Sequence, residues 1–230
     1  MRRWLRESGK ASVMFIVLKS AAKPSVSVEL GRAQSGAHAQ GTVLNQLEWE
    51  DIRCASCRFG ARFEHCAMVR SCAEIYGYFC DVVSYGQAGA VLVSGEDRLE
   101  FTGSAQCVAA FAILACMVYS ECGQAAPYSF LLEHFCRVQG QTGNPAFFAN
   151  SQNRLGRQGV ESAVKSGRQS WHEQFDTLLR RKVVSVLGIY DNGGLNDTLR
   201  NASQILYSIS SLTLDELHTD RGASCKPGLI

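Results

Sequence analysis

The clearest pattern of apolar and polar positions lies in the middle of the chain. Residues 105–119, AQCVAAFAILACMVY, are apolar almost throughout, which predicts a helix buried on all sides, with Ser104 placed to cap its N-terminus. The segment is shorter than the roughly 20 residues that a membrane-spanning helix needs. Just before it, residues 90–101 hold two apolar runs around a Ser-Gly-Glu-Asp turn, in which Gly95 can adopt a positive φ. This stretch predicts a β-hairpin.

The pattern predicts helices on both sides of this central region. Between residues 62 and 83 the apolar side chains fall roughly on one helical face, although Gly77 weakens the pattern. Residues 128–138 follow Pro127, and proline suits the first turn of a helix because its missing N–H needs no partner there.

The C-terminal part shows the most regular helical spacing. One apolar face consists of Trp171, Phe175, Leu178, Leu179, Val183, Val186 and Leu187. After the Asp-Asn-Gly-Gly break at 191–194, a second face consists of Leu195, Leu199, Ala202, Leu206 and Ile209. Two such helices joined by a short break predict an αα-hairpin. Residues 183–190, VVSVLGIY, also have the composition of a β-strand, which is the alternative for that segment.

The N-terminal region is basic and poor in acidic residues. Residues 1–47 carry seven Lys and Arg against two Glu, although the formal net charge of the whole chain is only +2. Three interpretations stay open for residues 1–22. The apolar run ASVMFIVL followed by Ser-Ala-Ala resembles a secretory leader, and the arginines and serines are also typical of an organellar transit peptide. The third interpretation is that residues 13–18 form an ordinary strand of the domain.

Composition and turn-forming stretches set the domain organisation. With 46% hydrophobic and 19% charged residues, the chain can bury a core, and its small net charge gives no indication of a nucleic-acid partner. A small, polar, glycine-containing stretch at 31–42 predicts a linker. We therefore expect a basic leader or flexible arm at 1–41, a single globular domain at 42–218 and a frayed tail at 219–230.

Cysteines supply the main candidate chemistry. The chain has ten, and nine lie between residues 54 and 136, including three in the stretch CASCRFGARFEHC at 54–66. Two thiolates spaced as Cys-x-x-Cys can hold one zinc ion, and a zinc site needs four such ligands. The chain has Tyr76 at the position where the spacing would require a fourth ligand, so the set is incomplete. The candidate metal ligands are Cys54, Cys57, His65, Cys66 and Cys72.

Two other interpretations of these cysteines remain open. The pair Cys54 and Cys57 has the spacing of a redox couple, but redox domains of that kind need a facing proline loop, and no proline occurs between residues 24 and 127. Alternatively, the cysteines pack in a core as small apolar residues. For Cys107 and Cys116, nine positions apart in the apolar helix, we expect buried and unbridged thiols.

Familiar catalytic motifs are missing from the sequence. It contains no G-x-G-x-x-G, G-x-x-x-x-G-K-[ST], G-x-S-x-G or H-E-x-x-H pattern, which argues against the nucleotide-binding, hydrolase and metalloprotease classes that depend on them. Two sequons, at 196–198 and 201–203, are compatible with a secreted glycoprotein.

The sequence predicts an α-rich α+β fold with a buried central helix, a small β-hairpin and a C-terminal helical hairpin. The patterns favour a non-enzymatic binding or interaction protein with a structural cysteine-rich segment and a protein partner. The alternatives are a thiol-dependent enzyme or redox protein using Cys54 and Cys57, and a disulfide-bonded secreted glycoprotein. We expect no cofactor, with zinc as the alternative, and a cytoplasmic location, with secretion or import through residues 1–22 as the alternative.

Overall fold

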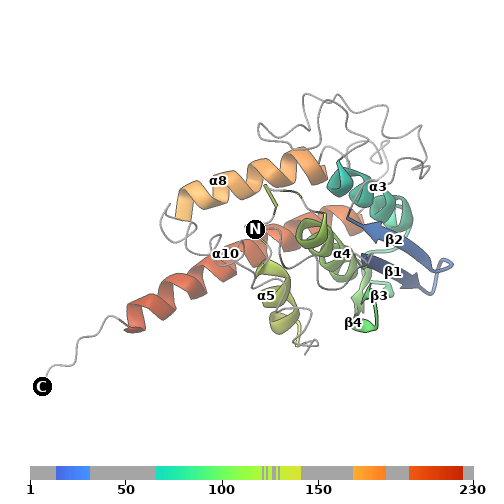
Figure 1. Cartoon of the computed structure of the whole chain (residues 1–230), viewed down its shortest axis with the longest axis horizontal. Helices are drawn as coiled ribbons and strands as arrows, with labels where there is room; N and C mark the ends of the chain where they lie inside the picture. Colours follow the sequence, from blue (N-terminus) through green and yellow to red (C-terminus); the bar gives the residue numbers. More distant parts are fainter. Residues whose placement is uncertain are drawn as a thin grey trace, which may run out of the picture.

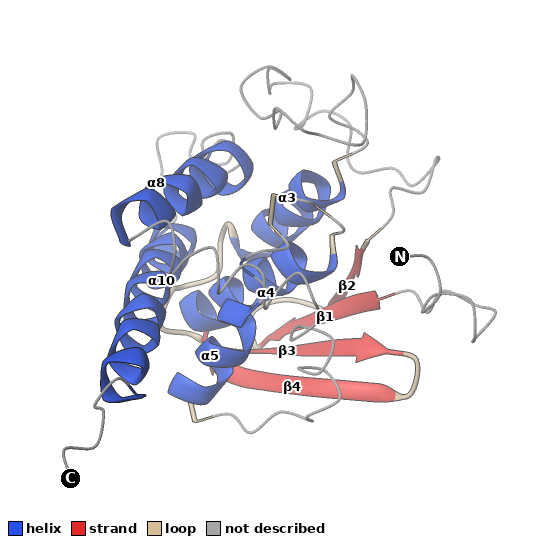
Figure 2. Cartoon of the chain, turned by 60° about the vertical axis from the view of Figure 1, so that its left-hand side comes forward, coloured by secondary structure: helices blue, strands red, loops and turns tan. Residues whose placement is uncertain are grey.

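The chain folds into one four-stranded antiparallel sheet with helices packed against one of its faces (Figures 1 and 2). The computed structural model describes residues 14–31, 66–120, 122, 124–125, 128, 130–140, 168–184 and 197–224. Within them helix is more abundant than strand, so the α-rich α+β class is confirmed.

The sheet has the strand order β2-β1-β3-β4, and every neighbouring pair is antiparallel. The strands are β1 (Met14–Ser20), β2 (Val26–Leu30), β3 (Gln87–Ser94) and β4 (Asp97–Ser104). Strands β3 and β4 form the predicted hairpin. Gly95 at its turn has φ 60°, a conformation that residues with a side chain rarely adopt.

Strands β1 and β2 correct the expected domain boundary. The sequence predicts that residues 14–31 belong to the leader or arm at 1–41, but β1 lies between β2 and β3 in the sheet. Ile16 and Leu18 are buried and Lys19 is exposed, the alternation of a strand with one face on a core. Residues 14–20 and 26–30 are therefore strands of the same sheet as β3 and β4, as the strand interpretation of residues 13–18 expects, and the sheet includes residues before position 42.

Six helical segments complete the described fold. They are α3 (Ala67–Phe79), α4 (Ala105–Tyr119), α5 (Phe130–Val138), α8 (Arg168–Leu179), the π-helical turn η3 (Arg180–Val184) and α10 (Asp197–Ser224). Helix α4 is central: it contacts all four strands and also packs against α3, α5 and α10. The predicted buried central helix is confirmed, with the predicted bounds. None of the described helices combines the length and apolar character required to cross a bilayer.

The C-terminal helices are confirmed as helices, but their arrangement differs from a simple hairpin. The buried face of α10 includes Leu199, Ala202 and Leu206, and this helix packs along α4 and α5 as well as against α8. The Tyr207 hydroxyl donates to Asp176 Oδ1 at 2.7 Å, which joins α10 to α8. The connecting residues 185–196, with most of the proposed strand at 183–190, lie outside the described residues.

The predicted tail boundary also needs correcting. Helix α10 continues to Ser224, so the frayed tail predicted from residue 219 is helical over its first six positions. The sequence offers no proline or capping glycine at residue 218 to end the helix there.

Candidate functional site

The predicted metal ligands are only partly within the described structure. Cys54, Cys57 and His65 lie outside the described residues, so their zinc and redox interpretations stay predictions. Cys66 precedes the first turn of α3 and Cys72 lies inside that helix. Six helical positions rotate a side chain by about 240° around the axis, so these two thiols face different neighbours. Among the described residues no group of three or more His, Cys, Asp or Glu side chains could hold a metal ion.

The thiol of Cys66 meets a buried lysine. Lys182 belongs to the π-helical turn η3, is fully buried, and donates from Nζ to Cys66 Sγ at 3.4 Å. Cys66 is 3% exposed. Tyr76, also fully buried, connects the same two elements because its hydroxyl donates to the Val183 carbonyl at 3.1 Å. An amine and a thiol that are far apart in sequence are therefore held in contact away from water.

The electrostatics of this pair favour a neutral thiol. Burial raises the pKa of Cys66 above its ordinary value of 9.0. Lys182 and the backbone N–H of Val69 act in the opposite direction, and nearby Cys122 adds to the increase. Since reactive cysteines depend on a thiolate, Cys66 does not have the character of an activated nucleophile at neutral pH.

A second thiol pair lies between α3 and α4. Cys72 and Cys116 are both fully buried, and they are close enough for Cys72 to influence the ionisation of Cys116. Burial, followed by Cys72, raises the pKa of Cys116 well above 9.0. The seven described cysteines carry free thiols, as expected for Cys107 and Cys116. Cys116 is buried as predicted, but Cys107, in the first turn of α4, is only half-buried.

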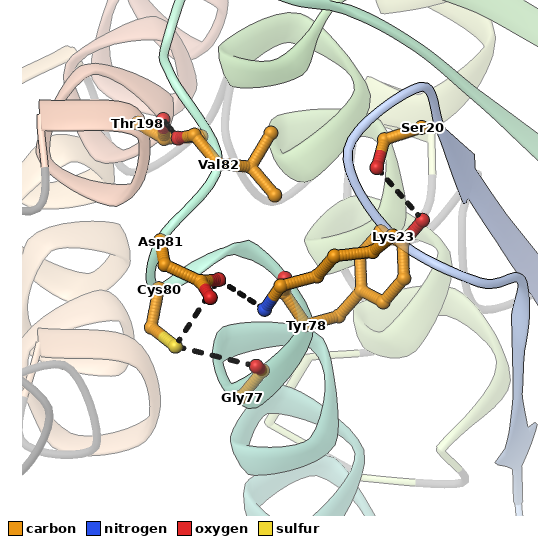
Figure 3. Close-up of polar contacts among 8 residues, drawn as sticks. All are labelled: Ser20, Lys23, Gly77, Tyr78, Cys80, Asp81, Val82 and Thr198. Atoms are coloured by element: carbon orange, nitrogen blue, oxygen red, sulfur yellow. Dashed lines mark hydrogen bonds and ion pairs between the residues drawn. The ribbon is translucent and has the colours of Figure 1, made fainter.

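A polar cluster lies between the β1–β2 turn and the C-terminal end of α3 (Figure 3). Lys23, in the turn between β1 and β2, forms an ion pair with Asp81 and donates to the Tyr78 carbonyl at 2.9 Å. Its ammonium lies 5.8 Å from the centre of the Tyr78 ring, and the Tyr78 hydroxyl donates to Ser20 Oγ at 3.2 Å. The hydrogen bond from Lys23 holds the pKa of Asp81 below its ordinary value. These contacts fix the β1–β2 turn to the C-terminal end of α3.

The loop after α3 presents two apolar side chains to solvent. Within this 80–86 loop, Val83 is 54% exposed and Tyr85 is 81% exposed, the largest exposure among the described bulky apolar residues. Val82, between Asp81 and Val83, is instead buried, and its carbonyl accepts a short hydrogen bond from the Thr198 hydroxyl at the start of α10 (Figure 3). The loop therefore turns one apolar residue inward and two outward.

The backbone of the 80–86 loop is held by further hydrogen bonds. The Ala105 and Gln106 amides at the start of α4 donate to the carbonyls of Gly86 and Ser84, at 2.7 and 3.1 Å. Ser104 is the N-cap residue as predicted, but its side chain makes no capping bond, and the loop carbonyls satisfy these first-turn amides instead.

A histidine joins α5 to α10. His134 is buried, its Nδ1 lies 2.6 Å from an Arg137 guanidinium nitrogen and 3.3 Å from Glu216 Oε2, and its Nε2 has no hydrogen-bond partner among the described residues. Burial lowers the pKa of His134 below 6.5; Glu216 opposes this shift and Arg137 adds to it. The neutral ring, accepting from Arg137, is thus the form that the fold holds.

The folded protein should consequently lose stability as the pH falls below 6.5. The unfolded chain, whose histidine keeps its ordinary pKa, binds a proton there before the folded chain does. The stability that the neutral His134 contributes is fully present above the pKa of histidine in the unfolded chain. It is lost as the pH falls through the lower pKa of His134 in the folded chain. Urea unfolding at pH 7.5 and 5.5 measures the loss, and His134→Gln should make it smaller. An equal loss in the variant would assign the pH dependence to other groups.

Comparison with known proteins leaves the fold without an assigned family. No protein-family model matches the chain, and no curated protein or solved structure shows significant similarity to it.

Proposed function

We propose that the protein is a non-enzymatic binding protein that contacts a protein partner through the 80–86 loop. The observation that carries the proposal is the exposure of Val83 and Tyr85 on a loop whose backbone is anchored on both sides. Apolar and aromatic side chains gain free energy when a partner removes them from water, and tyrosine is enriched among residues that dominate binding energies.

Rigidity of the loop strengthens this proposal. The Lys23–Asp81 ion pair, the Thr198 hydrogen bond to Val82 and the amides of α4 hold the loop in one conformation. A surface that is already ordered loses little conformational entropy when it binds, so more of the contact energy appears as affinity. The ring of Tyr85 then requires a partner surface with an apolar pocket that offers a hydrogen-bond acceptor to its hydroxyl.

Cross-linking tests the proposed surface directly. A photoreactive residue at position 85 should give a discrete cross-linked product in the native cells, because that side chain lies at the centre of the proposed contact. In the matched control the photoreactive residue replaces Glu96, in the exposed β3–β4 turn, and should give no cross-linked product. Excess unlabelled chain should suppress the product, whereas excess Tyr85→Ala chain should not. The same products from both positions would contradict the proposal.

The cysteines take a structural role in this proposal. Burial is the largest cause of the raised pKa of Cys66, Cys116 and Cys136, which favours packed thiols over nucleophiles. Free thiols at the seven described cysteines fit a reducing compartment, and this supports the cytoplasmic location. The thiol-dependent alternative rests on Cys54 and Cys57, outside the described residues, and stays a prediction.

The glycoprotein alternative receives less support from the described residues. Asn201 lies inside α10 and donates to Gln106 Oε1 at 2.9 Å, and the sequon residue Ser203 is buried with its hydroxyl bonded to the Leu199 carbonyl. Glycosylated asparagines are typical of surface loops. Asn201 itself is exposed, but this sequon lies within a helix and not in a loop.

A further inference from the structure

We infer that Cys66 and Lys182 form a peroxide-responsive modification site, in which oxidation joins Cys66 Sγ directly to Lys182 Nζ as a sulfenamide. The inference is independent of the proposed binding surface, because the pair lies between α3 and η3. It rests on the 3.4 Å contact between the two atoms and on the burial of both side chains.

Contact geometry is the first argument. A lysine amine ordinarily reaches a given thiol only by rare encounter, because its four-carbon stem samples many rotamers in water. Here the stem is enclosed and the amine already lies on the sulfur, so its effective concentration at that sulfur far exceeds that of any solute amine or thiol.

The chemistry follows from this contact. Hydrogen peroxide, which is small enough to reach buried sites, oxidises the thiol: the O–O bond breaks, an S–O bond forms, and water leaves. The Nζ lone pair then attacks the resulting sulfenic sulfur, an N–S bond forms, and the S–O bond breaks. The departing hydroxide takes a proton from the amine and leaves as a second water. In total, one thiol, one amine and one peroxide give one sulfenamide and two waters.

Burial affects two parts of this step. Attack uses the lone pair of the neutral amine, so Lys182 Nζ must give up a proton before the N–S bond forms. Exclusion of large molecules protects the sulfenic acid from cellular thiols that would otherwise capture it first. The raised pKa of Cys66 makes the first oxidation slow, so the site responds to sustained peroxide.

A covalent link here would join distant parts of the fold. The two residues are 116 positions apart in sequence, one before the first turn of α3 and the other in the turn that follows α8. The link would tie these elements together as a disulfide does, by removing conformations from the unfolded chain. A reducing thiol would reverse it by attacking the sulfur and releasing the amine.

Peptide mass spectrometry on the full chain tests the inference. The protein is treated with hydrogen peroxide, quenched with catalase, alkylated without reductant and digested with trypsin. We expect a peptide pair that joins Cys66 to an uncleaved Lys182. Its mass should be about 2 Da below the sum of the two peptides, corresponding to two lost hydrogen atoms, and dithiothreitol should separate it. Absence of this pair while Cys66 is oxidised in another form would overturn the inference.

Variants separate the link from competing products. Cys122→Ser should retain the cross-link, whereas a disulfide between Cys66 and Cys122 in the wild-type chain would overturn it. Lys182→Met keeps an unbranched apolar stem but has no amine, so Cys66 should stay as sulfenic acid and its labelling by dimedone should rise on the order of tenfold. If Lys182→Met folds and its dimedone labelling equals that of the wild-type chain, the inference is contradicted. If the variant does not fold, the presence or absence of the cross-link in the wild-type chain decides the inference.

Discussion

Replacing Leu199 with aspartate should abolish cooperative folding or lower the free energy of unfolding by about 4 kcal/mol or more. Leu199 is fully buried in the first turn of α10, a helix that packs against α3, α4, α5 and α8. A carboxylate at this position loses its hydration, and an uncompensated buried charge is among the most destabilising changes a side chain can make. Urea unfolding followed by circular dichroism measures the effect.

A matched control lies on the same helix. Leu212 is 51% exposed, so Leu212→Asp makes the same chemical change on α10 without removing the charge from water. The free energy of unfolding of this variant should stay within about 0.5 kcal/mol of the wild-type value. Equal stabilities of the two variants would show that Leu199 does not face the core.

Replacing Phe111 with alanine should cost about 3–5 kcal/mol of stability. Phe111 lies in the middle of α4 and stacks on Phe101 of β4, with ring centres 4.7 Å apart and planes 6° from parallel. Phe135 of α5 extends this aromatic contact, 5.4 Å from Phe101. The substitution opens a cavity at the point where the sheet, α4 and α5 meet. Denaturant unfolding or calorimetry measures the loss.

Two comparisons make this second prediction specific. Phe111→Leu retains most of the buried volume and should cost clearly less than the alanine variant. Tyr85→Ala removes an aromatic ring that is mostly in water and should change the free energy of unfolding by less than about 0.5 kcal/mol. A large cost for Tyr85→Ala would give that residue a structural role and weaken its proposed role in binding.

The sequence predicted the middle of the fold best. Helix α4 is apolar on all sides, and the polar residues Ser104 and Ser120 flank it. Both its burial and its limits therefore follow from local composition. The β3–β4 hairpin follows from Gly95 and its flanking apolar runs, which are also local features. Such elements need no knowledge of distant contacts.

Strands β1 and β2 were harder to predict because their evidence is not local. The apolar run that contains Ile16 and Leu18 adjoins a basic N-terminal region, as the apolar core of a leader does. The alternation in Val26-Ser-Val28-Glu-Leu30 indicates a strand, but five residues decide little by themselves. Pairing with β3, far along the chain, is what makes the segment part of the domain.

The Cys66–Lys182 pair could be predicted only in part. Lys182 lies seven positions after Phe175, on the apolar face of the predicted helix, so a charged residue at a core position was visible in the sequence. Its contact with Cys66 was not visible, because the spacing of the cysteines in the sequence does not reveal which other element each thiol meets. Cys66 and Cys72 were grouped by proximity in sequence, and the fold gives them separate neighbours.

The central position of β1 in the sheet also determines how the protein can assemble during synthesis. Strand β1 pairs on one side with its neighbour β2 and on the other with β3, where Ser20 lies opposite Ala88 and Met14 opposite Ser94. The ribosome adds roughly 70 residues between these strands, which takes about 4–15 s at ordinary elongation rates. Throughout that interval the β1–β2 hairpin has an unpaired inner edge and an uncovered apolar face. During this interval a chaperone can bind the hairpin, or its free edge can pair with a wrong strand. A slowly translated stretch before residue 94 would lengthen the interval.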